Sequence, residues 1–322
     1  MVDKVLIREV GTREGFQFEP PGIPTARKVE LIDALAGTGV RRIQTVSFVS
    51  PRSIPQMSDA EDVIAGLHPN RDVAYQALWF NVRGLRRAQD FGFLTMVGSV
   101  SLSASSKFAA RNWGSPDRAL SALNEPLIEE YVRLKLPVAI SVAAAFGCNF
   151  EGRVDEGTVI TLLGDTLTQL DERGLEVIEI TLSDTMAWAS PQSIKRLCDA
   201  VRTRFPDLPV SLHLHDTRGL GIANAMAALE VGIDRFDSAI AGLGGCPYAG
   251  HRGAAGNIAT EDFVLLCHEL GIETGIDPVR LLAAAALAEE VVGHPGSSRS
   301  LRGGHLTDTG VLNIDLPQDT GA

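Results

Sequence analysis

The stretch VSLHLHDTRGLGIANAMAAL, residues 210–229, decides the fold class. It begins as a short apolar run that ends in two histidines and an aspartate, and it continues with the periodicity of a helix. A strand followed at once by a helix is the unit from which α/β proteins with parallel sheets are built. The same unit recurs on both sides of this stretch, from one end of the chain to the other.

Eight short apolar runs predict the strands of the sheet. Their β-branched, near-continuous apolar character is typical of strands buried on both faces of a parallel sheet. We expect these strands at Val5–Val10, Arg42–Val46, Val73–Phe80, Leu94–Val100, Val138–Ala144, Val177–Leu182, Val210–His215 and Phe236–Ala241.

Helix start signals lie between the strands. Proline near the first helical position, and serine, threonine or aspartate at the position before the helix, are typical of a helix N-terminus. Such signals occur at Pro24-Thr25, Ser58-Asp59, Ser115-Pro116 and Ser190-Pro191. Glycines follow several predicted helices, as in LAGTG and LDERG, where a left-handed cap is expected.

Eight β–α units within about 290 residues fit the (β/α)8 TIM barrel, which usually takes roughly 250 residues. The alternative, an open doubly wound sheet, is disfavoured because no glycine-rich dinucleotide loop follows the first strand. We therefore predict a single α/β domain, a TIM barrel over residues 1–293. After Val292 the periodicity is lost, and residues 294–322 are expected to form a C-terminal tail or flap.

The composition narrows the class of protein. The chain has 322 residues, is 45% hydrophobic and carries a formal net charge of -11, with no basic run. These features argue against nucleic-acid and anionic-membrane partners. No apolar run approaches the roughly 20 residues of a membrane span, and the N-terminus resembles a strand rather than a signal peptide. The four cysteines form no CxxC pair, which favours a reducing cytoplasm.

His213 and His215 end the seventh predicted strand. Residues two apart on a strand project to the same side, and the carboxyl ends of barrel strands form the catalytic face. Two imidazoles at this spacing are half of a metal site. The alternative is a hydrogen-bonded histidine pair inside the barrel.

Two further residues come to the same rim. Glu14 follows the first strand, and Asn257 follows the glycine-rich loop after the eighth. Because strand eight lies between strands seven and one in a closed barrel, all four side chains can converge. Mixed nitrogen and oxygen ligands suit Mg²⁺ or Mn²⁺, with Zn²⁺ or Co²⁺ as alternatives. His251, in the glycine-rich loop, is an outside candidate that is more often solvated.

Several long motifs carry a family resemblance. They run in order along nearly the whole chain: EVGTREGFQFE, IQTVSFVSPRSIPQM, FGCNFEG, SDTMAWASP, HLHDTRGLGIANAMAAL, AGLGGCPYAGHRGAAGNIATED and LGIETGID. Together they closely resemble the 3-hydroxy-3-methylglutaryl-CoA lyase family, within the metal-dependent barrel lyases and Claisen-type synthases. The match is specific because the motifs stand at successive strand ends.

The resemblance implies an activity and a set of site residues. The activity is cleavage of a 3-hydroxy-3-substituted acyl-CoA into acetyl-CoA and a keto acid, a retro-Claisen reaction, by a homodimer or higher oligomer. The implied metal ligands are Glu14, His213, His215 and Asn257. The implied catalytic residues are Arg13, Asp184, His213 and Cys246. The implied substrate-binding residues are Gln17, Gln44 and Ser47.

Each catalytic assignment has a structural alternative. Arg13 suits an enolate or alkoxide oxygen because it keeps its charge, but it could equally form a salt bridge. Asp184 would orient or relay a proton, or else cap a helix. Cys246 would protonate the enolate carbon, or else be a small buried residue.

The chain also departs from the family pattern. Glu14 and Gln44 stand where the lyases usually have Asp and Glu, and the loop before Asn257 is longer. Met186 and Trp188 replace smaller residues after strand six. These changes predict a relative that acts on a different acyl-CoA.

Two other functions compete with the lyase. Condensing synthases of the isopropylmalate type carry a Glu-Arg pair where this chain has Gly245-Cys246, and often a C-terminal regulatory domain, so they are disfavoured. A non-catalytic barrel is the other alternative, because Glu14 and Gln44 alter the predicted site.

Overall fold

Eight parallel strands form the central sheet of the protein. The computed structural model describes residues 1–114, 124–245, 256–307 and 309–312. The strands lie in the order β3-β2-β1-β10-β9-β8-β5-β4. Their bounds are β1 Leu6–Glu9, β2 Arg42–Ser47, β3 Ala74–Leu78, β4 Gly98–Ser103, β5 Val138–Ala143, β8 Val177–Asp184, β9 Val210–Leu214 and β10 Arg235–Ser238.

The two ends of this sheet meet, so the fold is the predicted TIM barrel. A parallel bridge joins Tyr75 of β3 to Leu94, and the Thr95 N–H donates to the Tyr75 carbonyl at 2.7 Å. The fourth strand was predicted at Leu94–Val100, but Leu94 belongs to this single bridge and the strand proper begins at Gly98. As predicted, β10 lies between β9 and β1.

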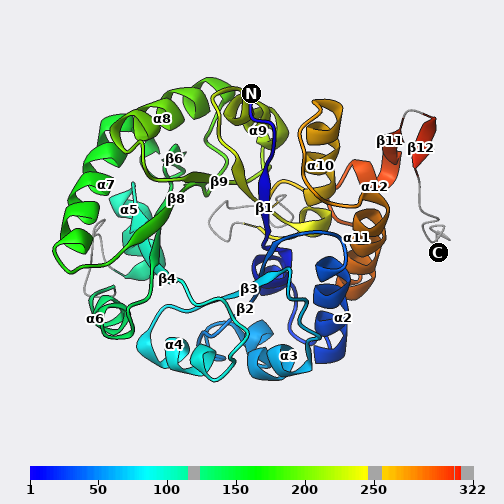
Figure 1. Ribbon diagram of the computed structural model, residues 1–322, viewed down its shortest axis with the longest axis horizontal. Helices are drawn as coiled ribbons and strands as arrows, with labels where there is room; N and C mark the ends of the chain where they lie inside the picture. The colour runs from blue at the N-terminus through cyan, green and yellow to red at the C-terminus, as the bar shows by residue number, and fades with distance from the viewer. Residues whose placement is uncertain (115–123, 246–255, 308, 313–322) are drawn as a thin grey trace.

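Helices surround the sheet (Figure 1). Their bounds are α1 Phe16–Phe18, α2 Thr25–Ala36, α3 Ala60–Gly66, α4 Val82–Gln89, α5 Ser106–Trp113, α6 Glu125–Leu134, α7 Glu156–Asp171, α8 Pro191–Arg204, α9 Gly221–Glu230, α10 Thr260–Glu269, α11 Pro278–Val292 and α12 Ser300–Gly303. Ser190 caps α8 through a reciprocal capping box with Ser193, as its start signal predicted. The signal at Ser115-Pro116 lies outside the described residues. None of the described helices is both long and apolar enough to cross a membrane.

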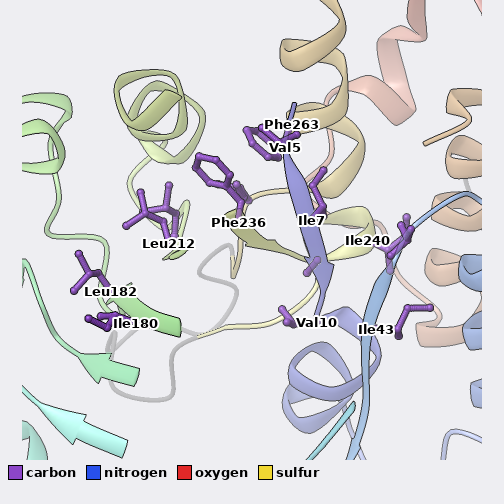
Figure 2. Packing of buried hydrophobic residues seen from close by; sticks show 14 of the residues in the cluster. Val5, Ile7, Val10, Ile43, Ile180, Leu182, Leu212, Phe236, Ile240 and Phe263 are labelled. Carbon is purple, nitrogen blue, oxygen red and sulfur yellow. The ribbon is translucent and has the colours of Figure 1, made fainter. Parts of the chain in front are cut away.

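The outward face of the strands is apolar and the inward face is mostly polar, which differs from the near-continuous apolar strands expected. Ile180 and Leu182 of β8 are fully buried in the hydrophobic core, whereas Thr181, between them, lines a cavity inside the barrel. On the outer face Phe236 of β10 packs against Phe263 of α10, with ring centroids 4.6 Å apart (Figure 2). The hydrophobic core therefore lies between sheet and helices, and the barrel interior is polar.

Charged side chains fill the amino-terminal end of the interior. The buried Glu179 carboxylate is within 3.5 Å of Arg8 and within 3.0 Å of Arg42 and Arg235. Arg8 also forms a two-point ion pair with Asp237, at 2.8 and 3.0 Å. Because a buried charge is costly without a partner, these ion pairs hold the charged side chains in position inside the barrel.

Another buried carboxylate, Glu261 at the start of α10, gives a stability prediction. It accepts the Ala241 N–H at 3.0 Å, and burial raises its pKa to about 8. Because the raised pKa means that the folded state holds this proton more tightly than the unfolded state does, the contribution to stability is fully present below the ordinary carboxyl pKa. It is lost as the pH rises through about 8.

We therefore expect Glu261→Gln, which keeps an acceptor oxygen, to raise the melting temperature at pH 9 more than at pH 5. The measurement is thermal unfolding of both proteins at the two pH values. Glu269→Gln, at the exposed end of the same helix, is the control. An equal shift at both pH values would contradict this role.

The start of the predicted C-terminal tail packs onto the barrel. The Ser297 N–H donates to the Ala241 carbonyl at 2.9 Å, and Asp262 of α10 accepts the Ser300 N–H at 2.6 Å. Beyond α12, the antiparallel strands β11 (His305–Thr307) and β12 (Gly310–Leu312) form a hairpin at the edge of the molecule (Figure 1).

Candidate active site and metal centre

A tight turn after β1 brings the first site residues to the carboxyl rim. Residues Gly11–Gly15 form a π-helical turn, in which the Phe16 N–H donates to the Gly11 carbonyl, and the Glu14 N–H donates to the Val10 carbonyl at 2.7 Å. A side chain at Gly11 would come within 2.8 Å of the Glu9 carboxylate, so the turn needs glycine there. The turn presents Arg13 and Glu14 above the barrel interior.

Glu14, His213 and His215 converge at this rim. The two Nε2 atoms of the histidines lie 3.0 Å apart, and Glu14 Oε1 is 3.4 Å from His213 and 3.2 Å from His215. All three side chains are buried, and they form a group that could hold a metal ion. The predicted convergence of strands one and seven is thus present.

Asn257 lies beside the same group. It forms an antiparallel bridge with His215, and its buried Oδ1 atom has no hydrogen-bond partner in the described part of the chain. A Cβ placed on Gly244 would be 2.9 Å from Asn257 Nδ2 and 3.7 Å from Glu14 Cγ, so Asn257 and Glu14 flank one glycine. An unpaired amide oxygen beside a carboxylate and two imidazoles fits a divalent cation.

Arg13 links two predicted substrate-binding residues to the group of Glu14, His213 and His215, called the metal group below. Its Nε donates to Gln44 Oε1 at 2.5 Å, and one terminal nitrogen donates to Gln17 Oε1 at 3.4 Å. Its other terminal nitrogen is 3.0 Å from Glu14 Oε2. Glu14 therefore uses one oxygen toward the histidines and the other toward Arg13.

Asp237 is a site residue that the sequence reasoning missed. Its Oδ2 lies 3.0 Å from His213 Nδ1, and Arg8 donates to both oxygens of the carboxylate. Its signal is the alternation in β10, RFDS, where the charged residues Arg235 and Asp237 lie two apart and so share one face of the strand, opposite Phe236. The assumption of strands apolar on both faces hid that signal.

The local electrostatics favour a cation. Despite burial, His213 and Arg13 hold the pKa of Glu14 well below its usual range. Asp237 is also buried, yet Arg8 and His213 lower its pKa to about 2. Burial opposes protonation of His213, but Glu14 and Asp237 raise its pKa to about 9. Carboxylates that stabilise a proton here would stabilise a metal ion in its place.

Asp184 and Ser47 do not join this group in the described structure. The buried Asp184 carboxylate accepts the N–H groups of Trp188 and Ala189, at 2.6 and 3.1 Å, and burial raises its pKa to about 6. Ser47 ends β2 fully buried, and its hydroxyl finds no partner among the described residues. Cys246 lies outside the described residues, as does His251.

Met186 and Trp188 pack away from the barrel interior. Met186 is fully buried in a small cluster with Phe108 and Cys148, and the Trp188 indole donates to Asn149 Oδ1 at 2.8 Å. They support the hairpin of β6 (Gly147–Cys148) and β7 (Gly152–Arg153). The expectation that they reshape an acyl pocket thus finds no support in these contacts.

The comparisons with known proteins agree with this geometry. The HMGL-like family model matches residues 4–288. The chain belongs to the HMGL-like family. It is 37% identical to the hydroxymethylglutaryl-CoA lyase YngG of Bacillus subtilis, over 93% of this chain and 97% of that protein.

Two other members of the family are informative. A Pseudomonas aeruginosa 3-hydroxy-3-isohexenylglutaryl-CoA/hydroxymethylglutaryl-CoA lyase is 35% identical, over 93% of this chain and 96% of its own length. The structure of an Acinetobacter baumannii HMG-CoA lyase in complex with coenzyme A and 3-methylmalate superposes with a TM-score of 0.83 at 37% identity, covering 95% and 97% of the two chains.

Within the family pattern, Glu14 was the departure that put the metal site most in doubt. The longer side chain still reaches both histidines, and its second oxygen pairs with Arg13. Gln44, the other departure, keeps a hydrogen bond to Arg13 but brings no charge. The added methylene has therefore not removed residue 14 from the group.

We expect Asp237→Asn to weaken metal affinity by roughly 10- to 100-fold, because partners that orient a ligating histidine commonly contribute that much. The amide keeps the size of the side chain but loses the charge that faces His213 and Arg8. Titration of the metal-free protein with Mn²⁺ measures the effect, and Asp234→Asn, at an exposed neighbouring position, is the control. Equal affinities would assign Asp237 to stability alone.

Proposed function

We propose that this protein is a metal-dependent carbon–carbon lyase that cleaves a 3-hydroxy-3-substituted acyl-CoA into acetyl-CoA and a keto acid. The convergence of Glu14, His213 and His215 beside Arg13, in a chain of the HMGL-like family, carries the proposal. The condensing-synthase and non-catalytic alternatives have no comparable support, since relatives across more than nine-tenths of the chain are named as lyases.

Glu14, His213, His215 and Asn257 would hold one divalent cation, and this mixed ligand set favours Mg²⁺ or Mn²⁺ over Zn²⁺ or Co²⁺. Such a cation lowers the pKa of a chelated hydroxyl group and fixes its orientation. The relative whose structure contains coenzyme A and 3-methylmalate supports an acyl-CoA as the substrate class. We retain the homodimer and the cytoplasm as predictions.

Side chains of the protein would carry out the charge stabilisation and proton transfers of the reaction. Cleavage removes the proton of the 3-hydroxyl, passes the C2–C3 bonding electrons to a thioester enolate, and ends when the enolate carbon gains a proton. Arg13, anchored by Gln44 and Glu14, would stabilise the charge on the enolate oxygen. Cys246 would supply the proton to carbon.

His213 cannot fill both of its predicted roles at once. Asp237 occupies its Nδ1 atom, and its Nε2 atom faces Glu14 and His215. A His213 that holds the cation has no nitrogen left to accept the hydroxyl proton. We therefore propose that a neighbouring carboxylate accepts this proton. Asp184, at the end of the neighbouring strand β8, is our candidate to orient or relay it.

The test is acetyl-CoA release from a panel of 3-hydroxyacyl-CoA thioesters, with metal content measured on the same protein. Release that requires a divalent cation is expected. Bound metal without release from any thioester would favour the non-catalytic barrel.

Gln44 gives a prediction about the substrate. An amide cannot supply the charge or exchange the proton that glutamate could supply beside Arg13. We expect the wild type to cleave 3-hydroxy-3-methylglutaryl-CoA less efficiently than a thioester with another C3 substituent, and Gln44→Glu to narrow the difference.

The measurement is kcat/KM for 3-alkyl and 3-aryl glutaryl and succinyl thioesters. Gln76→Glu is the matched control, because it adds the same charge to the same cavity, one strand away. If the wild type prefers the methyl substrate and Gln44→Glu changes nothing, the departure at residue 44 is neutral.

A further inference from the structure

One cavity runs from the metal group across the barrel interior. It has a volume of about 240 Å³, and Arg13, Glu14 and His213 stand at one end of it. Small side chains form the opposite wall, on β4 and β5: Ser99, Ser101, Ala139 and Ser141. A group attached to a substrate carbon held at the metal end can therefore extend toward β4 and β5.

The wall carries hydroxyl groups that are free to bind a ligand. Ser101 and Ser141 lie side by side in the register of β4 and β5. Within the described part of the chain, the hydroxyls of Ser99, Ser101 and Ser141 form no hydrogen bond, whereas Thr181, next in register, is paired with Ser211 at 2.8 Å. Half-buried hydroxyls in a cavity favour a ligand that offers hydrogen-bonding atoms.

The charges of the cavity favour a neutral group. Arg8 is paired with Asp237, and Arg13 is paired with Glu14. Among the described residues that line the cavity, no other arginine or lysine is present to receive an anionic substituent. A carboxylate placed against β4 and β5 would lose its hydration without gaining a cationic partner.

We propose that the wall of β4 and β5 is a specificity pocket for the C3 substituent of the substrate, and that it selects a neutral, hydrogen-bonding group larger than methyl. This inference rests on the proposed lyase function. It places selectivity on Ser99, Ser101 and Ser141 rather than on Met186 and Trp188, which pack elsewhere.

The test compares four substrates with the metal-loaded wild-type enzyme: 3-hydroxyglutaryl-CoA thioesters that carry methyl, propyl, methoxymethyl or carboxymethyl at C3. Propyl and methoxymethyl have nearly the same shape, but only methoxymethyl accepts a hydrogen bond. We expect kcat/KM for methoxymethyl to exceed that for propyl by about tenfold or more, because a polar site discriminates strongly against an analogue that leaves its groups unpaired. We expect it also to exceed the values for methyl and carboxymethyl.

Two variants locate the effect. Ser101→Ala should lower the methoxymethyl-to-propyl ratio several-fold, and Ser141→Leu should lower the methoxymethyl-to-methyl ratio because it fills the pocket. Ser103→Ala is the matched control, since this serine of β4 donates to the Ser105 carbonyl and does not line the cavity. It should leave both ratios unchanged.

The outcomes separate the pocket from the function. Cleavage with methyl, propyl or carboxymethyl preferred over methoxymethyl would overturn the pocket and leave the lyase standing. Ratios that move equally in Ser101→Ala and Ser103→Ala would also overturn it. Cleavage of none of the thioesters would overturn the lyase function, and the pocket with it.

Discussion

Replacing both His213 and His215 with alanine should abolish binding of the divalent metal and leave the barrel folded. Their Nε2 atoms are 3.0 Å apart and share the Glu14 carboxylate, so the double variant removes both nitrogen ligands. Their strand neighbours Leu212 and Leu214 remain packed in the core, which is why the fold should survive. Elemental analysis after removal and readdition of Mn²⁺ measures occupancy, and circular dichroism measures folding.

A second histidine pair provides the control. His268 Nδ1 and His305 Nε2 also lie 3.0 Å apart, between α10 and the C-terminal hairpin. Alanine at both of these positions should leave metal occupancy unchanged. Full occupancy in the His213/His215 double variant would refute the assigned metal centre.

Arg13→Met should lower kcat about a hundredfold, equivalent to on the order of 3 kcal/mol in the barrier, with a much smaller change in KM. Its guanidinium is fixed by Gln17, Gln44 and Glu14, so it can stabilise charge that develops during cleavage without reorganising. Steady-state kinetics with the best substrate measures the effect.

Arg13→Lys distinguishes charge from geometry. Lysine keeps the charge but cannot bond three partners in one plane, so we expect partial recovery of kcat. Metal content is measured for both variants, because methionine leaves Glu14 Oε2 without its ion pair. An unchanged kcat in Arg13→Met would make Arg13 a structural residue.

The barrel could be predicted from the sequence because short apolar runs alternate with helical patterns along the whole chain, and several of these helices have clear start signals. The convergence of these side chains could be predicted because His213 and His215 end the predicted strand Val210–His215, and the strand order of a barrel brings Glu14 and Asn257 to them. Such inferences need only periodicity and topology.

Other features depend on contacts that periodicity does not encode. Whether Gln44 touches Arg13, or Met186 faces a pocket, is decided by side-chain packing around irregular turns. Asp237 was missed for a different reason, because its alternating pattern was present in the sequence but a barrel interior was assumed to be apolar. Strand alternation would have found it.

The absence of charged residues from β4 and β5 has a consequence for how such an enzyme can diversify. The two strands read GSVSLS and VAISVA, whereas β1, β8, β9 and β10 carry the ion pairs and the histidines. A substitution at Ser99, Ser101 or Ser141 removes neither a salt bridge nor a proposed metal ligand. If the proposed pocket is correct, a mutant library confined to these three positions can change the preferred substrate and leave the ion pairs and the proposed ligands in place.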